Sequence, residues 1–168
     1  MNTSYLVPRS KDAFVGPYWK DRWRDYLHIV SGIAAFLQPA SVLEIGAYDS
    51  SLMVGSDTMD IRNNPSIRHD ARSVPWPIAD KAYDLAIATQ VWEHLGPSQL
   101  QAFLELRRTC SRAILSFPYR WMKCAKDNIH YNITKEKIDE WTDHTAPVLE
   151  IQAGIRLIRL YVFEEPGV

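Results

Sequence analysis

The sequence predicts an α/β fold in which helices cover both faces of a mostly parallel sheet, with an antiparallel hairpin at the C-terminal end. Three observations support this. Short, apolar, β-branched runs at residues 41–46, 83–89 and 112–118 are typical of strands buried on both faces. Segments with helical spacing of apolar residues separate or precede such runs, which favours crossover connections. The last part of the chain alternates apolar and polar residues on either side of Ala153-Gly154, a hairpin signal.

Three segments are predicted to be helical. Between Pro17 and Pro39, apolar residues recur at helical spacing on one broad stripe, which we interpret mainly as core packing: Trp19, Trp23, Tyr26, Leu27, Val30, Ile33, Ala34 and Leu37. A second helix is expected in residues 97–110. A third is expected in residues 134–143, with Thr134 as its capping residue.

With the remaining segments, the predicted order along the chain is a helix, four strands (the third of them short), a helix, a strand, a helix and the hairpin. Residues 56–61 read as a weaker strand and residues 66–71 as a short one. The hairpin strands are residues 147–152 and 155–163. In open sheets of this kind, ligands bind beyond the carboxyl ends of the strands, where the strand order reverses. The residues that follow residues 41–46, 56–61 and 83–89 are therefore the expected site.

Composition limits the classes of function. The 168 residues suit one domain, residues 1–168, with residues 1–16 as an N-terminal extension. The formal net charge of -1 gives no electrostatic reason to expect nucleic acid as a partner. No apolar run is long enough to span a bilayer, the N-terminus does not have the pattern of a signal peptide, and the two cysteines cannot form a disulfide framework. A cytoplasmic protein is expected.

Four stretches carry a family resemblance: "VLEIGAYDS" (42–50), "TMD" (58–60), "HDARSVPWPIADKAYDLAIATQVWEHL" (69–95) and "RAILSFPYRW" (112–121). Together they resemble the class I S-adenosylmethionine-dependent methyltransferases, in the branch whose fourth strand is followed by a Glu-His pair. The resemblance extends over about residues 41–163 and implies a Rossmann-like three-layer sandwich. It also implies S-adenosyl-L-methionine as the cofactor.

The resemblance assigns roles to residues at four strand ends. Gly46, Ala47 and Tyr48 would bring backbone N–H groups to the methionine part of the cofactor, and Glu44 would act at its ammonium group. Asp60 would accept hydrogen bonds from both ribose hydroxyls, since a carboxylate offers two suitably spaced acceptors. Asp70 and Ala71 would contact the adenine of the cofactor. Thr89 and Gln90 would flank its sulfonium group.

The sequence departs from the family at the loop after the first strand. The family's E-x-G-x-G-x-G pattern reads Glu44-Ile45-Gly46-Ala47-Tyr48-Asp49-Ser50, so only the first glycine is present. The residues between Gly46 and the second strand are also too few for a full crossover helix, so this helix is expected to be missing or reduced. Tyr48 would either close over the cofactor or fill its space.

Two functional hypotheses follow. The first is methyl transfer to a small-molecule or sugar-like acceptor, with His94 or His130 as the general base. In this hypothesis four aromatic residues line the acceptor side: Trp92, Tyr119, Trp121 and Tyr131. The second is a non-catalytic, methyltransferase-like module that binds or regulates a partner protein, which the altered loop and short chain favour. A partner or a second copy of the chain could complete the acceptor site.

Structural roles remain open for several of these residues. Glu44 could be a paired structural acid, Asp60 and Asp70 could form turns, and Glu93-His94 could orient the helix that follows. The spacing of Glu93, His94 and His130 matches no known metal-ligand pattern, so no metal is expected. A nicotinamide-dependent oxidoreductase is disfavoured because the chain lacks G-x-G-x-x-G.

Overall fold

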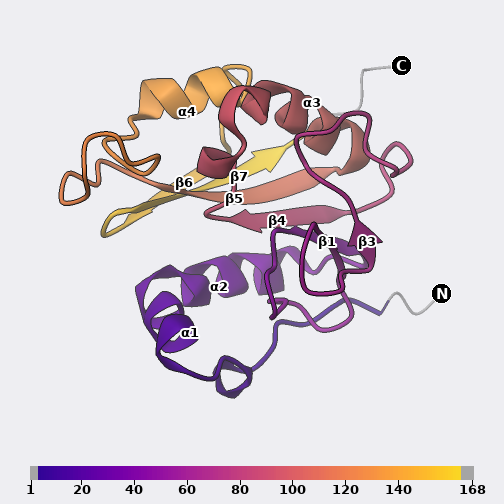
Figure 1. Ribbon diagram of the computed structural model, residues 1–168. Coiled ribbons are helices and arrows are strands. Elements are labelled where there is room, and N and C mark those ends of the chain that lie inside the picture. The colour runs from indigo at the N-terminus through magenta and orange to yellow at the C-terminus, as the bar shows by residue number, and fades with distance from the viewer. Residues whose placement is uncertain (1–3, 164–168) are drawn as a thin grey trace.

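A computed structural model describes residues 4–163 and contains one seven-stranded sheet (Figure 1). The strand order is β3-β2-β1-β4-β5-β7-β6. The first five strands along the chain, β1 to β5, are parallel to one another. Strand β7 is antiparallel to both of its neighbours, β5 and β6. The strands are β1 (Val42–Ile45), β2 (Asp57–Asp60), β3 (Ile67–Arg68), β4 (Leu85–Thr89), β5 (Arg112–Pro118), β6 (Leu149–Ala153) and β7 (Arg156–Val162). The mostly parallel sheet with antiparallel C-terminal strands confirms the predicted fold class.

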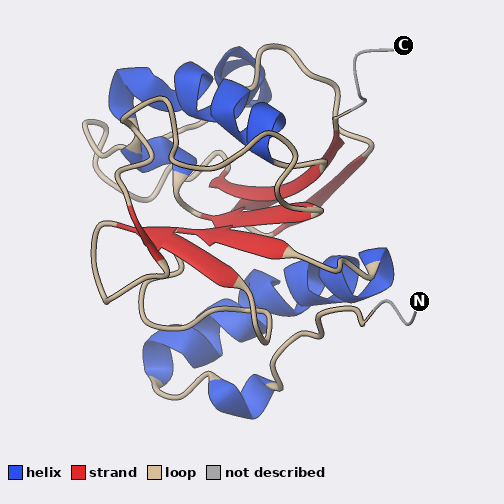
Figure 2. Ribbon diagram, turned by 90° about the vertical axis from the view of Figure 1, so that its right-hand side faces the viewer, coloured by secondary structure: helices blue, strands red, loops and turns tan. Residues whose placement is uncertain are grey.

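Helices cover both faces of the sheet, so the molecule has three layers (Figures 1 and 2). One face carries α1 (Pro17–Arg22) and α2 (His28–Leu37), and the other carries α3 (Gln99–Thr109) and α4 (Lys135–Trp141). Short 3₁₀ turns complete the helical segments: η1 (Lys11–Ala13), η3 (Trp92–His94) and η4 (Gly96–Ser98). Alternate residues of β1 pack into different cores, with Leu43 and Ile45 on the α3 side and Val42 on the α2 side. This burial on both faces explains the unbroken apolar runs of the sequence.

The predicted N-terminal helix is three consecutive helical segments. Between α1 and α2 lies η2 (Trp23–Leu27), a π-helical turn. Tyr26 and Leu27 within it are buried, as the apolar stripe predicted. Gln38, in a left-handed conformation with φ 47°, ends α2 just before Pro39.

No helix connects β1 to β2, which confirms the expected loss of the first crossover helix. The N-terminal extension lies against this connection instead. The N–H of Arg9 donates to the carbonyl of Leu52 at 2.8 Å, and the N–H of Val54 donates to the carbonyl of Val7 at 2.9 Å. Leu52 and Met53 are buried in the same core as α2. An extended segment and a buried loop thus occupy the place of the missing helix.

The C-terminal hairpin adds two antiparallel strands to one side of the sheet. Both of its strands join the sheet, and β7 lies between β5 and β6. Arg159 of β7 is buried and donates to the carboxylates of Glu150 at 2.8 Å and Asp139 at 2.6 Å. This paired arginine explains how a charged residue is accommodated inside the sheet. Helix α4 begins after Thr134, whose hydroxyl accepts from the N–H of Lys137, as predicted.

No helix formed by residues 4–163 has both the length and the apolar character needed to cross a membrane. Cys110 is buried, Cys124 is partly buried, and both are free thiols. This agrees with the absence of a disulfide framework in the sequence.

Candidate functional site

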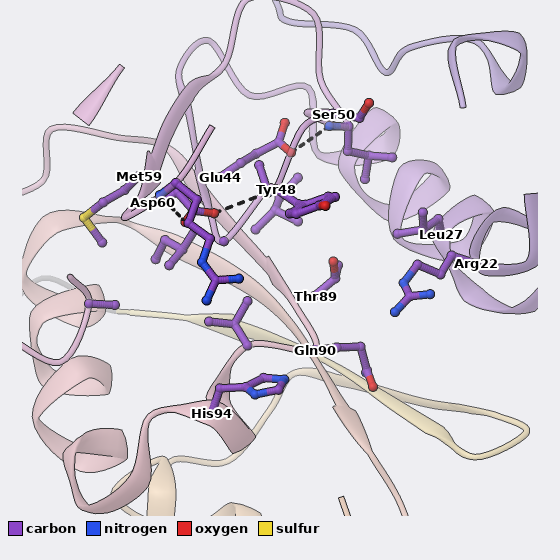
Figure 3. Close-up of a pocket in the computed structure, with 18 of the residues that line it drawn as sticks. Arg22, Leu27, Glu44, Tyr48, Ser50, Met59, Asp60, Thr89, Gln90 and His94 are labelled. Atoms are coloured by element: carbon purple, nitrogen blue, oxygen red, sulfur yellow. Dashed lines mark hydrogen bonds between the residues drawn. The ribbon is translucent and has the colours of Figure 1, made fainter. Parts of the chain in front are cut away.

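A cavity of about 820 Å³ lies at the carboxyl ends of β1, β2 and β4 (Figure 3). It brings together all the residues that the sequence suggested for the cofactor and the two suggested as general bases. From the cofactor assignments these are Glu44, Gly46, Ala47, Tyr48, Asp60, Asp70, Ala71, Thr89 and Gln90. The two candidate bases, His94 and His130, lie in the same wall. The cavity is located where doubly wound sheets bind ligands, at the reversal of strand order beside β1 and β4.

Gly46 makes the turn at the end of β1. Its φ of 66° is left-handed, and a Cβ on this residue would lie 2.6 Å from Cγ2 of Val91. Its N–H donates to the carbonyl of Met59 at 2.9 Å. The one glycine retained from the family pattern is therefore required by its backbone conformation and by close contact with the segment after β4.

Tyr48 also has a left-handed backbone, with φ 57°, and the residue is 51% exposed. Its ring centroid is 6.2 Å from that of Tyr18. Figure 3 shows its ring among the side chains that line the cavity. Because the cavity extends beyond β1 with Tyr48 in its wall, this residue does not fill the space.

Glu44 is buried, and its carboxylate organises the loop that replaces the missing helix. It accepts from the N–H of Leu52 at 2.6 Å, the N–H of Met53 at 2.8 Å and the hydroxyl of Ser56 at 2.8 Å. Burial raises the pKa of Glu44, while these hydrogen bonds oppose the shift. The geometry gives Glu44 a structural role, the alternative that the sequence left open, in addition to its place in the cavity wall.

The two aspartates at the far end of the cavity are also hydrogen-bonded locally. Asp60, at the end of β2, accepts from the N–H of Tyr48 at 3.3 Å and the N–H of Arg62 at 3.0 Å. Asp70 binds the guanidinium of Arg72 through both oxygens, at 3.0 and 2.7 Å, and this hydrogen bonding lowers the pKa of Asp70. Each carboxylate thus shapes a turn and faces the cavity.

Thr89 and Gln90 end β4 beside this space. Gln90 has a left-handed φ of 57°, and its N–H donates to the carbonyl of Ser116 at 3.0 Å. Its side-chain amide donates to the hydroxyl of Ser116 at 3.1 Å. These two hydrogen bonds to β5 fix the chain where it turns toward η3.

The N-terminal helical segments contribute cavity residues that sequence reasoning missed. Tyr18, Trp19 and Arg22 line the cavity opposite the strand ends, and Arg22 stacks on Tyr18 with its Cζ 3.6 Å from the ring centroid. The indole N–H of Trp19 donates to Asp49 at 3.1 Å, which ties this helix to the altered loop. Four tryptophans and tyrosines within residues 18–26 were the available signal. Periodicity alone predicts a buried stripe and does not show which part of a helix borders a cavity.

At the other end of the cavity, Glu93 lies beneath two histidines. Its residue exposure is 4%, and burial raises its pKa to about 7. Oε1 of Glu93 lies 3.9 Å from Nε2 of His94 and 3.7 Å from Nε2 of His130. Burial lowers the pKa of each histidine, and for His130 the neighbouring His94 and Arg156 add to this effect.

The aromatic wall predicted for the acceptor side is only partly correct. Trp121 lines the cavity beside Arg156, whose Cζ is 5.6 Å from the centroid of Trp121. Trp92 and Tyr119 are instead buried in the core on the α3 side, and Tyr131 is outside the cavity wall. Trp92 lies in η3, where its indole N–H donates to the carbonyl of Gln99 at 3.2 Å, so its ring packs under α3 instead of facing the ligand space.

Comparison with known proteins gives structural matches only. No family model matches the chain, and no curated protein matches its sequence. A solved structure from Pyrococcus horikoshii OT3 matches with a TM-score of 0.69 at 14% identity, covering 90% of this chain and 93% of that one. A second match is described as a SAM-dependent methyltransferase and possible histamine N-methyltransferase from Thermotoga maritima. Its TM-score is 0.61 at 11% identity, with 86% and 95% coverage.

A third match, a SAM-dependent methyltransferase from Aquifex aeolicus, has a TM-score of 0.59 at 11% identity, with 74% and 82% coverage. The chain has the class I methyltransferase fold. In this fold the reduced first crossover is a local change, since the strand order and the cavity at the strand ends remain. Other matches include the 16S rRNA methylase RmtB, with a TM-score of 0.57 at 16% identity, so the fold leaves the acceptor class open.

Proposed function

We propose that this protein transfers a methyl group from S-adenosyl-L-methionine to a small-molecule or sugar-like acceptor. The observation that supports the proposal is the cavity at the strand ends, which is lined by the nine expected cofactor-binding residues and by both candidate bases. Its volume of about 820 Å³ falls in the usual range for small-molecule sites, about 300 to 1,000 Å³. Tyr48, the residue that could have filled this space, leaves it open.

The cofactor would lie across the strand ends. Asp60 would accept from the ribose hydroxyls, and Asp70 and Ala71 would contact the adenine. The methionine part would lie along the loop after β1 and the end of β4, near these residues: Glu44, Gly46, Ala47, Tyr48, Thr89 and Gln90. Because the carboxylate of Glu44 already accepts three hydrogen bonds, its action on the cofactor's ammonium group would use its remaining lone pairs.

The chemistry asks little of the protein beyond alignment and exclusion of water, because the sulfonium is already an activated methyl donor. The bond from sulfur to the methyl carbon breaks and its electron pair stays on sulfur, which leaves S-adenosylhomocysteine. The acceptor's lone pair forms the new bond to the methyl carbon, and the acceptor's proton must leave. His94 and His130 are the proposed catalytic residues because both line the cavity and their rings lie close together, with centroids 5.2 Å apart.

A second candidate function is a methyltransferase-like module that binds a partner protein without catalysis. The use of Glu44 as an anchor for Leu52 and Met53 favours it, since this acid is committed to the fold. The two candidates differ in one simple property. The catalytic protein must bind the cofactor, and the non-catalytic module need not.

Calorimetric titration of the full chain with S-adenosylhomocysteine separates them. At about 100 times its dissociation constant, a ligand stabilises the folded state by about 2.7 kcal/mol, which for this size raises Tm by about 5 to 10 °C. We expect saturable binding and this thermal shift, both retained in Glu140→Ala, which removes an exposed acid on α4. Absence of binding at millimolar concentration overturns the enzymatic proposal and leaves the partner-binding module.

A further inference from the structure

The carboxylate of Glu93 is buried without a partner. Its side chain is 0% exposed, and within residues 4–163 neither of its oxygens has a hydrogen bond. A buried carboxylate without a compensating donor or cation is strongly unfavourable, so such groups are almost always paired or bound to a metal. Glu93 is held in η3, directly after the segment that follows β4, where the helical turn fixes it under the cavity floor.

Two histidines point nitrogen atoms at the same carboxylate oxygen. Nε2 of His94 and Nε2 of His130 lie 3.9 and 3.7 Å from Oε1 of Glu93. Both distances exceed the range of a hydrogen bond, about 2.7 to 3.2 Å. The ring centroids of the two histidines are 5.2 Å apart. One histidine comes from η3 and the other from the loop between β5 and α4, so the fold alone brings them together.

The protonation of His130 is fixed by Asn128. Oδ1 of Asn128 accepts from the backbone N–H of His130 at 2.9 Å, which identifies this atom as the amide oxygen. Nδ1 of His130 is 2.7 Å from the same oxygen and must therefore be the protonated nitrogen. In the neutral imidazole, Nε2 then carries a lone pair. A lone pair on His130 and the oxygens of Glu93 thus face one another with no donor between them.

We propose that Glu93, His94 and His130 bind a divalent transition-metal cation. In a tetrahedral site with metal–nitrogen and metal–oxygen distances of about 2.0 to 2.2 Å, ligand atoms lie about 3.3 to 3.6 Å apart. The two distances from Glu93, 3.7 and 3.9 Å, exceed this by a few tenths of an ångström, and the ligand atoms of all three residues lie within 4.8 Å of one another, so binding requires a small closure of the cluster. The hydrogen bond from His130 to Asn128 is the outer contact typical of a metal-bound histidine.

The ligand set indicates the class of metal. Two imidazoles and one carboxylate suit zinc, cobalt, nickel, iron or manganese, whereas magnesium and calcium prefer oxygen ligands throughout. His94 and His130 line the cavity, so the free coordination positions face the acceptor side. Three protein ligands with an open position are the arrangement of catalytic rather than structural zinc sites. The histidines would then act on the acceptor's proton through the bound cation instead of as free bases.

Arg156 is a positive group whose charge acts on both Glu93 and His130. Its Cζ lies 5.8 Å from the ring centroid of Tyr26 and 5.6 Å from that of Trp121. Its own hydrogen bond goes to the carbonyl of Ile155 at 3.3 Å, not to Glu93. Arg156 therefore contributes only a distant charge and leaves the oxygens of Glu93 available to a cation.

Metal binding can be tested without any cofactor or acceptor. Full-length protein treated with a chelator is titrated with Co²⁺ alone, followed by visible absorption and calorimetry. We expect one equivalent to bind and to develop the ligand-field bands of a low-coordinate site. Glu93→Gln and His130→Ala should each weaken binding by about a hundredfold or more, and Asn128→Ala by about tenfold, because outer contacts tune affinity by about 10- to 100-fold. His28→Ala, which removes an exposed histidine on α2, should bind like the wild type.

Glu93→Gln keeps the shape of the side chain and removes a buried charge, so we expect it to fold, which a thermal melt verifies. His130→Ala, at a partly buried loop position, provides an independent variant. Lack of one-equivalent binding by the wild type, or binding that both variants leave unchanged, overturns the proposal. The outcome is independent of methyl transfer, because titration of the metal-free protein with S-adenosylhomocysteine tests that function separately.

Discussion

The carboxylate of Glu44 accepts a hydrogen bond at 2.6 Å from the backbone N–H of Leu52, in the loop that connects β1 to β2 without a helix. The same carboxylate accepts from Met53 and Ser56. Leu52 and Met53 are buried, and each buried N–H that has no acceptor costs about 1 to 3 kcal/mol of folding free energy. The acid at the end of β1 is therefore a folding determinant as well as a residue of the cavity wall.

We expect Glu44→Gln to destabilise the protein by about 2 to 4 kcal/mol, since the amide nitrogen would face backbone N–H groups that need an acceptor. For a chain of this size this lowers Tm by about 5 to 15 °C. Thermal and urea unfolding measure the effect, with Glu140→Ala as the control acid on the surface. A Tm equal to that of the wild type would show that the loop is held by other contacts.

Asp60→Ala should weaken the binding of S-adenosylhomocysteine by about ten- to a hundredfold. Two charge-assisted hydrogen bonds worth about 1.5 to 3 kcal/mol each would be lost, and water would recover part of this. Asp60→Asn should have an intermediate effect, because it keeps one acceptor oxygen for a ribose hydroxyl but loses the charge and the second equivalent oxygen. Calorimetry of both variants measures the affinities. Wild-type affinity in Asp60→Ala would remove this residue from the ribose site.

Gly46→Ala is expected to combine two penalties. A left-handed φ of 66° costs an alanine about 1 to 2 kcal/mol. The new Cβ would also lie 2.6 Å from Cγ2 of Val91, and such overpacking costs about 1 to 3 kcal/mol.

Gly154→Ala is the matched control, because Gly154 has a φ of 57° and no heavy atom within 4 Å of the added Cβ. Urea unfolding should therefore show a larger loss for Gly46→Ala than for Gly154→Ala. The double variant with Val91→Ala should recover only the contact penalty. Equal losses at the two glycines would mean that the contact with Val91 relaxes without cost.

His94→Ala and His130→Ala should each lower the rate of methyl transfer by about a hundredfold or more, with little change in cofactor affinity. The assay follows transfer of labelled methyl groups to a panel of hydroxyl- and amine-bearing metabolites. His28→Ala is the control for loss of a histidine outside the cavity. Undiminished turnover in both single variants would exclude the histidines from the chemistry.

Strand prediction succeeded wherever one short segment carries the signal. The segments at residues 41–46, 83–89 and 112–118 are apolar because β1, β4 and β5 are covered on both faces, and local composition is enough to identify them. The short distance between Gly46 and β2 likewise predicted the loss of the crossover helix. The position of β7 inside the sheet was not predictable, because alternation does not distinguish which strand of a hairpin pairs with the rest.

Local patterns in the sequence were enough to identify the buried strands and to place the site beyond their carboxyl ends, because parallel sheets have a regular geometry. The family resemblance added the cofactor residues that line the cavity, whereas the order of the strands in the sheet came from the structure. The contacts that individual side chains make are visible only in the tertiary structure. It turned Glu44 toward Leu52, placed Tyr18 and Arg22 across the cavity, and brought His130 to the buried Glu93. Such contacts join residues far apart in the chain, and no spacing encodes them, because their distances depend on how whole elements pack.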